Sequence, residues 1–162
     1  MKNPSAPIIF VIDENKVYAE LVRQYLQIAD CTEVLKFTRF EDCYGYLDLE
    51  PDIVIAEYEY SSGTNQGMKF LKTIKFKSPE TRVIFLTANS DVETAIRAIR
   101  SGATDYIIKS KYAPDKLLRK VVALVKYKKE LLRNSVIRKK LMTSVSFLLI
   151  LIGCLIFFYT HF

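Results

Sequence analysis

The chain has 162 residues, of which half are apolar and 26% are charged. These values fit one compact domain with an appendage, and they exclude a chain that is disordered throughout. The single histidine, His161, argues against a histidine-based zinc site and against a Ser-His-Asp triad. Three cysteines (Cys31, Cys43 and Cys154) lack CxxC spacing and cannot all pair, so we expect reduced, buried thiols in a domain that faces the cytosol.

The net charge of +6 is unevenly distributed along the chain. Residues 1–113 carry 14 basic and 16 acidic side chains, residues 114–144 carry 10 basic and two acidic ones, and residues 145–162 carry none. This order predicts three parts. They are a nearly neutral domain at 6–128, a basic helical stalk at 129–140 and an apolar tail at 141–162.

The apolar tail is long enough to suggest a transmembrane helix. At about 1.5 Å per residue, a helix over 141–162 would span about 33 Å, and a hydrocarbon core is about 30 Å thick. Basic residues at 138–140 precede it, which by the positive-inside rule would leave the N-terminal domain in the cytoplasm. We therefore expect a single-pass tail anchor and a membrane location. A buried core helix or an oligomerisation helix is the alternative.

Strands and helices alternate through the first domain. Apolar, largely β-branched runs predict buried strands at 8–12, 34–37, 53–56, 83–86 and 106–108. Helical spacing of apolar residues predicts helices over 17–26, 41–49, 68–76 and 92–99, and a last helix that Pro114 opens. The five repeats predict an α/β fold, a doubly wound parallel sheet with helices on both faces.

Polar residues follow four of the predicted strands. Asp13 and Glu14 come after the first strand, Glu57 after the third, Thr87 after the fourth and Lys109 after the fifth. Binding sites in such sheets form at the carboxyl ends of the strands. We therefore expect three carboxylates, a hydroxyl and an ammonium group to meet at one edge. The alternatives are a helix cap for Asp13, a solvated charge at a helix start for Glu14, an acid that merely ends a strand for Glu57, a strand or turn residue for Thr87 and a surface lysine for Lys109.

Four segments, at 9–15, 51–57, 83–88 and 102–109, resemble the receiver domain of two-component response regulators, the CheY-like family. The resemblance covers about residues 6–128 and implies a flavodoxin-like five-stranded sheet in the order 2-1-3-4-5. It also implies a phosphoacceptor, an acidic pair that binds Mg²⁺, two groups that contact the phosphoryl group and an aromatic switch residue. The matching positions are Glu57; Asp13 and Glu14; Thr87 and Lys109; and Tyr106.

Two of these positions depart from the pattern that the resemblance implies, because Glu57 and Glu14 stand where aspartates are usual. One extra methylene moves a carboxylate by about 1.5 Å, and a misplacement of about 1 Å can cost a hundredfold in rate. Mg²⁺ also demands near-octahedral geometry. We therefore predict an atypical receiver, a pseudo-receiver that is not an enzyme, with weak or vestigial Mg²⁺ binding. Glu57 would stay unphosphorylated and would pair with Lys109.

The basic stalk predicts a contact with an anionic surface. Its side chains close to the predicted membrane are Lys126, Lys128, Lys129, Arg133, Arg138, Lys139 and Lys140. A homodimer through a parallel coiled coil is a second interpretation, although Lys128 and Lys129 interrupt the apolar seam. The sequence has no recognisable reading element such as a helix-turn-helix, so nucleic acid is not an expected partner.

The leading functional interpretation is a membrane-anchored receiver that works in phosphorelay signalling by protein contact. Its partner would be a histidine kinase, a phosphotransfer protein or a membrane signalling protein. One alternative is a single-domain receiver that is phosphorylated, on Glu57 or on another carboxylate such as Glu59. The other is a soluble nucleic-acid-binding protein that uses residues 116–140.

Overall fold

The structure is a computed structural model that describes residues 6–28, 33–59 and 66–161; the side chains of 148, 151, 154–156 and 158–161 lie outside the described set. The chain divides into two units, residues 1–123 and 124–162. Of the three cysteines predicted to be buried, Cys43 is buried and reduced, while Cys31 and the side chain of Cys154 lie outside the described residues.

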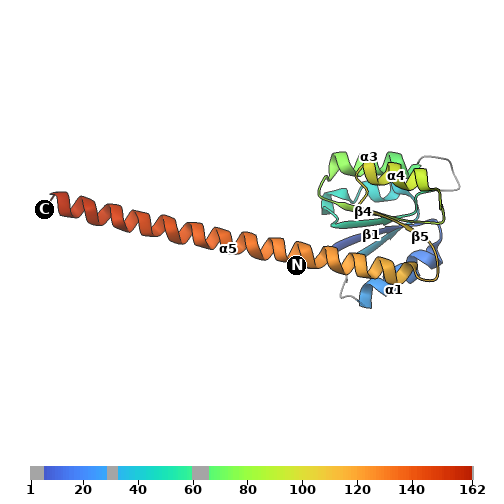
Figure 1. The fold of residues 1–162 in the computed structure, drawn as a ribbon, viewed down its shortest axis with the longest axis horizontal. Coiled ribbons are helices and arrows are strands. Elements are labelled where there is room, and N and C mark those ends of the chain that lie inside the picture. The colour runs from blue at the N-terminus through green and yellow to red at the C-terminus, as the bar shows by residue number, and fades with distance from the viewer. Residues whose placement is uncertain (1–5, 29–32, 60–65, 162) are drawn as a thin grey trace. The chain divides into compact units, whose positions relative to one another are not determined.

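The first unit is built on a parallel sheet whose strands alternate with helices along the chain (Figure 1). The five strands lie in the order β2-β1-β3-β4-β5, which confirms the predicted topology. In Figure 1, α3 and α4 cover one face of the sheet, and α1 and the first turns of α5 cover the other. The elements are β1 (Ile8–Ile12), α1 (Lys16–Ile28), β2 (Glu33–Phe37), α2 (Phe40–Tyr44), the 3₁₀ turn η1 (Leu47–Leu49), β3 (Ile53–Ala56), α3 (Gln66–Lys77), β4 (Arg82–Thr87), α4 (Val92–Arg100), β5 (Asp105–Ile108) and α5 (Ala113–His161).

The prediction of one helix over 41–49 was wrong. The α-helix ends at Tyr44, and Gly45 follows it with φ −69° before the short 3₁₀ turn η1. Glycine is a poor helix former, and here it separates two short helical pieces. Glu50 then adopts a left-handed conformation with φ 53°, which turns the chain into the Pro51 segment before β3.

The core follows from the two-residue period of the strands. Phe10, Val54 and Phe85 belong to one buried cluster with Phe40 and Phe70, whose rings stack with 4.2 Å between centroids. Because alternate side chains point to opposite faces, the intervening strand residues face α1 and α5. Those residues include Ile9, Ile55 and Ile84, each at most 1% exposed. Both faces are therefore filled, and the carboxyl edge of the sheet is left for polar groups.

The expected membrane-spanning tail is not found. A spanning helix needs about 20 consecutive apolar residues. Among the residues that the structure describes, no helix is long and apolar enough to cross a membrane. The first six residues of the predicted segment include Thr143, Ser144 and Ser146, and the Thr143 hydroxyl donates to the carbonyl of Lys140. This finding overturns the transmembrane helix over 141–162, the tail anchor, and the single-pass location with a cytoplasmic N-terminal domain.

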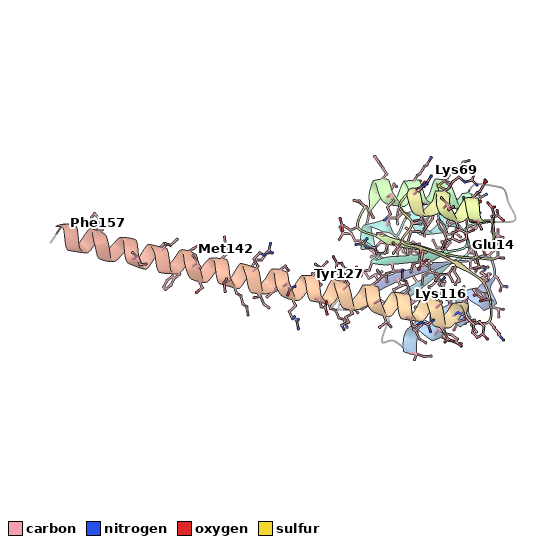
Figure 2. The ribbon with its side chains drawn as sticks, viewed as in Figure 1. Glu14, Lys69, Lys116, Tyr127, Met142 and Phe157 are labelled. Carbon is pink, nitrogen blue, oxygen red and sulfur yellow. The ribbon has the colours of Figure 1, made fainter. Side chains whose placement is uncertain are left out.

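The contact of the basic stalk residues with an anionic surface stays a prediction. All seven, from Lys126 to Lys140, are exposed on the second unit. Figure 2 shows side chains projecting above and below α5 between Tyr127 and Met142. Whether this helix forms a homodimer stays a prediction.

Candidate functional site

The predicted polar residues lie at the carboxyl edge of the sheet. Backbone hydrogen bonds between strands continue one residue past β1, β3 and β5, and Thr87 is the last residue of β4. The amide of Asp13 donates to the carbonyl of Phe37 (3.1 Å), and that of Glu57 donates to Ile12 (2.9 Å). The amide of Lys109 donates to Thr87 (2.7 Å). These bonds fix the backbone at the positions that the sequence predicted would meet.

Three of the predicted site residues are in direct contact. Lys109 Nζ lies 2.6 Å from Asp13 Oδ2 and 2.8 Å from Glu57 Oε2, which confirms the expected pairing of Lys109 with Glu57. The side chains are largely buried, with exposed fractions of 20% for Lys109, 8% for Asp13 and 11% for Glu57. We call these three residues the ion triad.

The second oxygen of each carboxylate in the ion triad is also engaged. Glu57 Oε1 accepts from the amide of Tyr58 at 2.8 Å, and the amide of Glu59 lies 3.4 Å away. Asp13 Oδ1 accepts from the amide of Asn15 at 2.9 Å. Removing ions from water costs several kcal/mol each unless partners replace the lost hydration. The ion triad and these amides supply such partners.

The lysine of the ion triad is held in its charged form. Burial by itself lowers the pKa of Lys109, but hydrogen bonds with Asp13 and Glu57, together with their negative charges, outweigh it. The result is a pKa above the ordinary value of 10.5. Lys109 is therefore a permanent cation at neutral pH, between two carboxylates.

Thr87 and Tyr106 belong to a neighbouring network on the loop after β4. Thr87 is fully buried, and its hydroxyl accepts from the amide of Asn89 (3.1 Å). The Tyr106 hydroxyl donates to the carbonyl of Asn89 (3.2 Å), and the Asn89 side chain donates to Glu59 (2.6 Å). Burial raises the pKa of Tyr106 to about 12, although the Thr87 hydroxyl opposes this.

Tyr106 lies with its ring in the core. Its centroid is 5.8 Å from that of Tyr58 and 6.2 Å from that of Phe85. The aromatic residue of β5 is therefore packed inward and tied to the loop after β4, and its partner Asn89 connects this loop to the segment after β3. Thr87 is connected to the ion triad through its carbonyl, which accepts from the Lys109 amide at 2.7 Å.

Glu14 differs from the other predicted acids in its exposure. It is exposed, and Figure 2 shows it at the outer edge of the fold. Among the described residues, no group of three or more histidine, cysteine, aspartate or glutamate side chains is placed to hold a metal ion. Lys109 also takes one oxygen of both Asp13 and Glu57. Mg²⁺ would compete with the lysine ammonium for these two oxygens, and the binding of Mg²⁺ stays a prediction.

Sequence reasoning missed two features of this edge. Tyr18, which lies within the helix predicted over 17–26, places its ring centroid 4.4 Å from Lys109 Nζ. The Glu59–Asn89 hydrogen bond across two loops was also unforeseen. The sequence did contain one indication of this role for Tyr18. It lies in the first turn of the helix after β1, beside the edge where the site forms.

The comparisons with known proteins agree with this fold. A family model described as the response regulator receiver domain matches residues 9–122. The chain belongs to the response regulator receiver family. The Vibrio cholerae regulatory protein LuxO is 30% identical over 99 residues, which are 61% of this chain and 21% of LuxO. The Escherichia coli regulatory protein AtoC is 39% identical over 64 residues, which are 40% of this chain and 13% of AtoC.

Solved receiver structures superpose on the chain. The BeF₃-activated receiver domain of DrrB, a Thermotoga maritima protein, has a TM-score of 0.63 at 29% identity, and the match covers 75% of this chain and 98% of that domain. A receiver domain protein from Clostridium thermocellum gives 0.66 at 26% identity, covering 77% and 98%. This receiver thus matches whole receiver domains but spans about a fifth or less of the length of LuxO and AtoC.

Proposed function

We propose that this receiver works without phosphorylation at Glu57, as a non-enzymatic module of two-component signalling. The ion triad would hold its carboxyl edge in one state, and a histidine kinase or a phosphotransfer protein would be its partner. Receivers of this family exchange signals with such proteins. The ion triad is the observation that carries the proposal.

The positions of the Glu57 oxygens support the absence of phosphorylation. Phosphoryl transfer needs a carboxylate oxygen that is free to approach the phosphorus in line. Glu57 Oε2 is bound to Lys109, and Oε1 accepts from the amide of Tyr58. A glutamate also reaches about 1.5 Å further than an aspartate on the same backbone. The nucleophile is therefore both occupied and displaced.

A phosphorylation assay on the full chain tests this proposal. The protein is incubated with acetyl phosphate and Mg²⁺, and a phosphoryl adduct is measured by intact mass and mapped on peptides. We expect no adduct on the native chain or on Glu57→Gln. Glu57→Asp is the matched variant that restores the shorter arm, and a DrrB receiver domain checks that the donor is active. An adduct on native Glu57 would overturn the proposal.

The same experiment separates this proposal from phosphorylation at another carboxylate. Glu59 lies two residues further, is exposed and accepts from the Asn89 side chain at 2.6 Å. Peptide mapping distinguishes Glu57 from Glu59 directly. An adduct on Glu59 that survives in Glu57→Gln would show a phosphorylated receiver and would contradict the non-enzymatic assignment.

The proposal also predicts that a phosphoryl donor does not change the affinity of the chain for its partner. A set of purified histidine kinase and phosphotransfer domains is titrated against the full chain, with and without acetyl phosphate. We expect the same dissociation constants in both conditions. A donor-dependent change in affinity that disappears in Glu57→Gln would contradict the proposal.

A further inference from the structure

The ammonium group of Lys109 has an aromatic neighbour in addition to the two carboxylates of the ion triad. Its Nζ is 2.6 Å from Asp13, 2.8 Å from Glu57 and 4.4 Å from the ring centroid of Tyr18. Aromatic faces attract cations within about 6 Å, and the attraction is stronger where water is excluded. Only 20% of the Lys109 side chain is exposed, so the ring replaces water that would otherwise reach the charge.

The position of Tyr18 is fixed by the same residues that build the triad. Asp13 Oδ1 accepts from the amide of Asn15 at 2.9 Å, and Asn15 Oδ1 accepts from the amide of Tyr18 at 3.0 Å. The Tyr18 ring faces Lys109, and the Lys109 ammonium donates to Asp13 Oδ2. Four residues thus form a closed circuit of contacts, in which Asn15 is the N-terminal cap of α1 and Tyr18 lies in its first turn.

The ring of Tyr18, and not its hydroxyl, makes this contact. The hydroxyl oxygen is buried and has no hydrogen-bond partner within the part of the chain that the structure describes. A buried hydroxyl that makes no hydrogen bond costs stability, and its removal is expected to be neutral or favourable. The part of Tyr18 that contacts Lys109 is therefore the face of its aromatic ring. Phenylalanine also has such a face, and leucine lacks one.

We propose that Tyr18 is a positioning residue that holds the Lys109 ammonium against Asp13 and Glu57 by covering it with its aromatic ring. The proposal deepens the proposed function and rests on it, because it names the side chain that keeps the ion triad closed. Opening of the edge would then require the Tyr18 ring and Lys109 to separate.

Lysine labelling on the full chain tests the role of Tyr18. The native protein, Tyr18→Phe and Tyr18→Leu are acetylated briefly with limiting acetic anhydride, and the rate at each lysine is measured by peptide mass spectrometry. Lys36 and Lys120, each in an ion pair that does not include Tyr18, are the internal references. We expect Tyr18→Phe to match the native rate at Lys109. Tyr18→Leu should raise it about two- to fivefold relative to the references, the factor for a weak cation–π contact.

Two further variants keep the test decisive. Val17→Leu alters the neighbouring residue, which is 81% exposed, and should leave the Lys109 rate unchanged. If Tyr18→Leu loses its cooperative melting transition, Tyr18→Met supplies an apolar side chain of comparable length without a ring. An unchanged Lys109 rate in the folded variant without a ring would overturn the proposal, and so would a rise in Tyr18→Phe equal to that in Tyr18→Leu.

The two proposals fail separately. Labelling uses no phosphoryl donor, so an adduct on native Glu57 would remove the proposed function while the rates at Lys109 still report on Tyr18. Conversely, an unchanged Lys109 rate together with an unphosphorylated Glu57 would remove only the role of Tyr18.

Discussion

Glu57 and Lys109 form an ion pair with 2.8 Å between Oε2 and Nζ, although their strands are not neighbours in the sheet. Lys109 follows β5 and reaches past the end of β4 to Glu57 after β3 and to Asp13 after β1. The pair therefore connects strands that share no ladder. A long, flexible lysine can do this, whereas backbone hydrogen bonds connect only adjacent strands.

Removing either partner should show strong coupling between them. Lys109→Met leaves two buried carboxylates close together, and we expect it to lower the free energy of unfolding by about 3–5 kcal/mol. Glu57→Gln removes one negative charge and should cost less. In the double variant the two effects should deviate from additivity by about 0.5–3 kcal/mol. Urea unfolding of the four proteins measures this.

A more exposed ion pair supplies the control. Lys120 and Asp105 are 2.9 Å apart, with exposed side-chain fractions of 38% and 23%. Lys120→Met should cost no more than about 1 kcal/mol. Purely additive effects of Lys109→Met and Glu57→Gln, or equal costs for Lys109→Met and Lys120→Met, would contradict the coupling.

The ion triad also predicts a loss of stability at alkaline pH. The pKa of Lys109 in the folded chain lies above its ordinary value of 10.5, so the unfolded chain loses that proton first. The contribution is complete below 10.5 and disappears as the pH rises through the folded pKa. Urea unfolding between neutral pH and about pH 11 should show a steeper loss for the native chain than for Glu57→Gln. Equal slopes would contradict this, since the other titrating groups are common to both proteins.

The residues at the carboxyl edge of the sheet could be predicted because they depend only on the pattern of apolar residues and on the parallel order of the strands. Apolar runs located the strands, parallel order placed their carboxyl ends together, and Asp13, Glu57 and Lys109 followed. The Tyr18 ring and the Asn89–Glu59 bond could not be predicted, because they depend on side-chain rotamers and loop paths that the pattern leaves open. The tail was judged on its apolar residues, its length and its lack of formal charge, and these did not establish a helix able to cross a membrane.

Cys43 should be almost unreactive in the folded protein. It is buried in the core cluster, and burial raises the pKa of its thiol to about 12. The thiolate is the reactive form of cysteine, so alkylation at neutral pH requires opening of the fold. We expect iodoacetamide to label Cys43 in urea and not in buffer, with peptide mass spectrometry assigning the site. Rapid labelling in buffer would show that this part of the core opens easily.

A side chain at position 67 should destabilise the fold, because Gly67 lies against Tyr58, the residue next to Glu57. A Cβ on Gly67 would lie 2.5 Å from the Tyr58 carbonyl oxygen and 2.8 Å from its Cδ2, whereas a Cβ on Gly45 would meet nothing within 4 Å. Tyr58 cannot retreat easily, since its ring packs 5.0 Å from Phe85, between centroids. Gly67→Ala should therefore cost about 1–3 kcal/mol by overpacking.

Gly45→Ala is the matched control for Gly67→Ala. Gly45 has an ordinary φ of −69°, so alanine there should be neutral or stabilise by up to about 1 kcal/mol. Because the Tyr58 amide donates to Glu57 Oε1, Gly67→Ala should also shift the Tyr58 amide resonance in ¹H–¹⁵N spectra, and Gly45→Ala should not. Equal stabilities of the two variants, or an unmoved Tyr58 resonance in Gly67→Ala, would show that the segment after β3 yields without disturbing the ion triad.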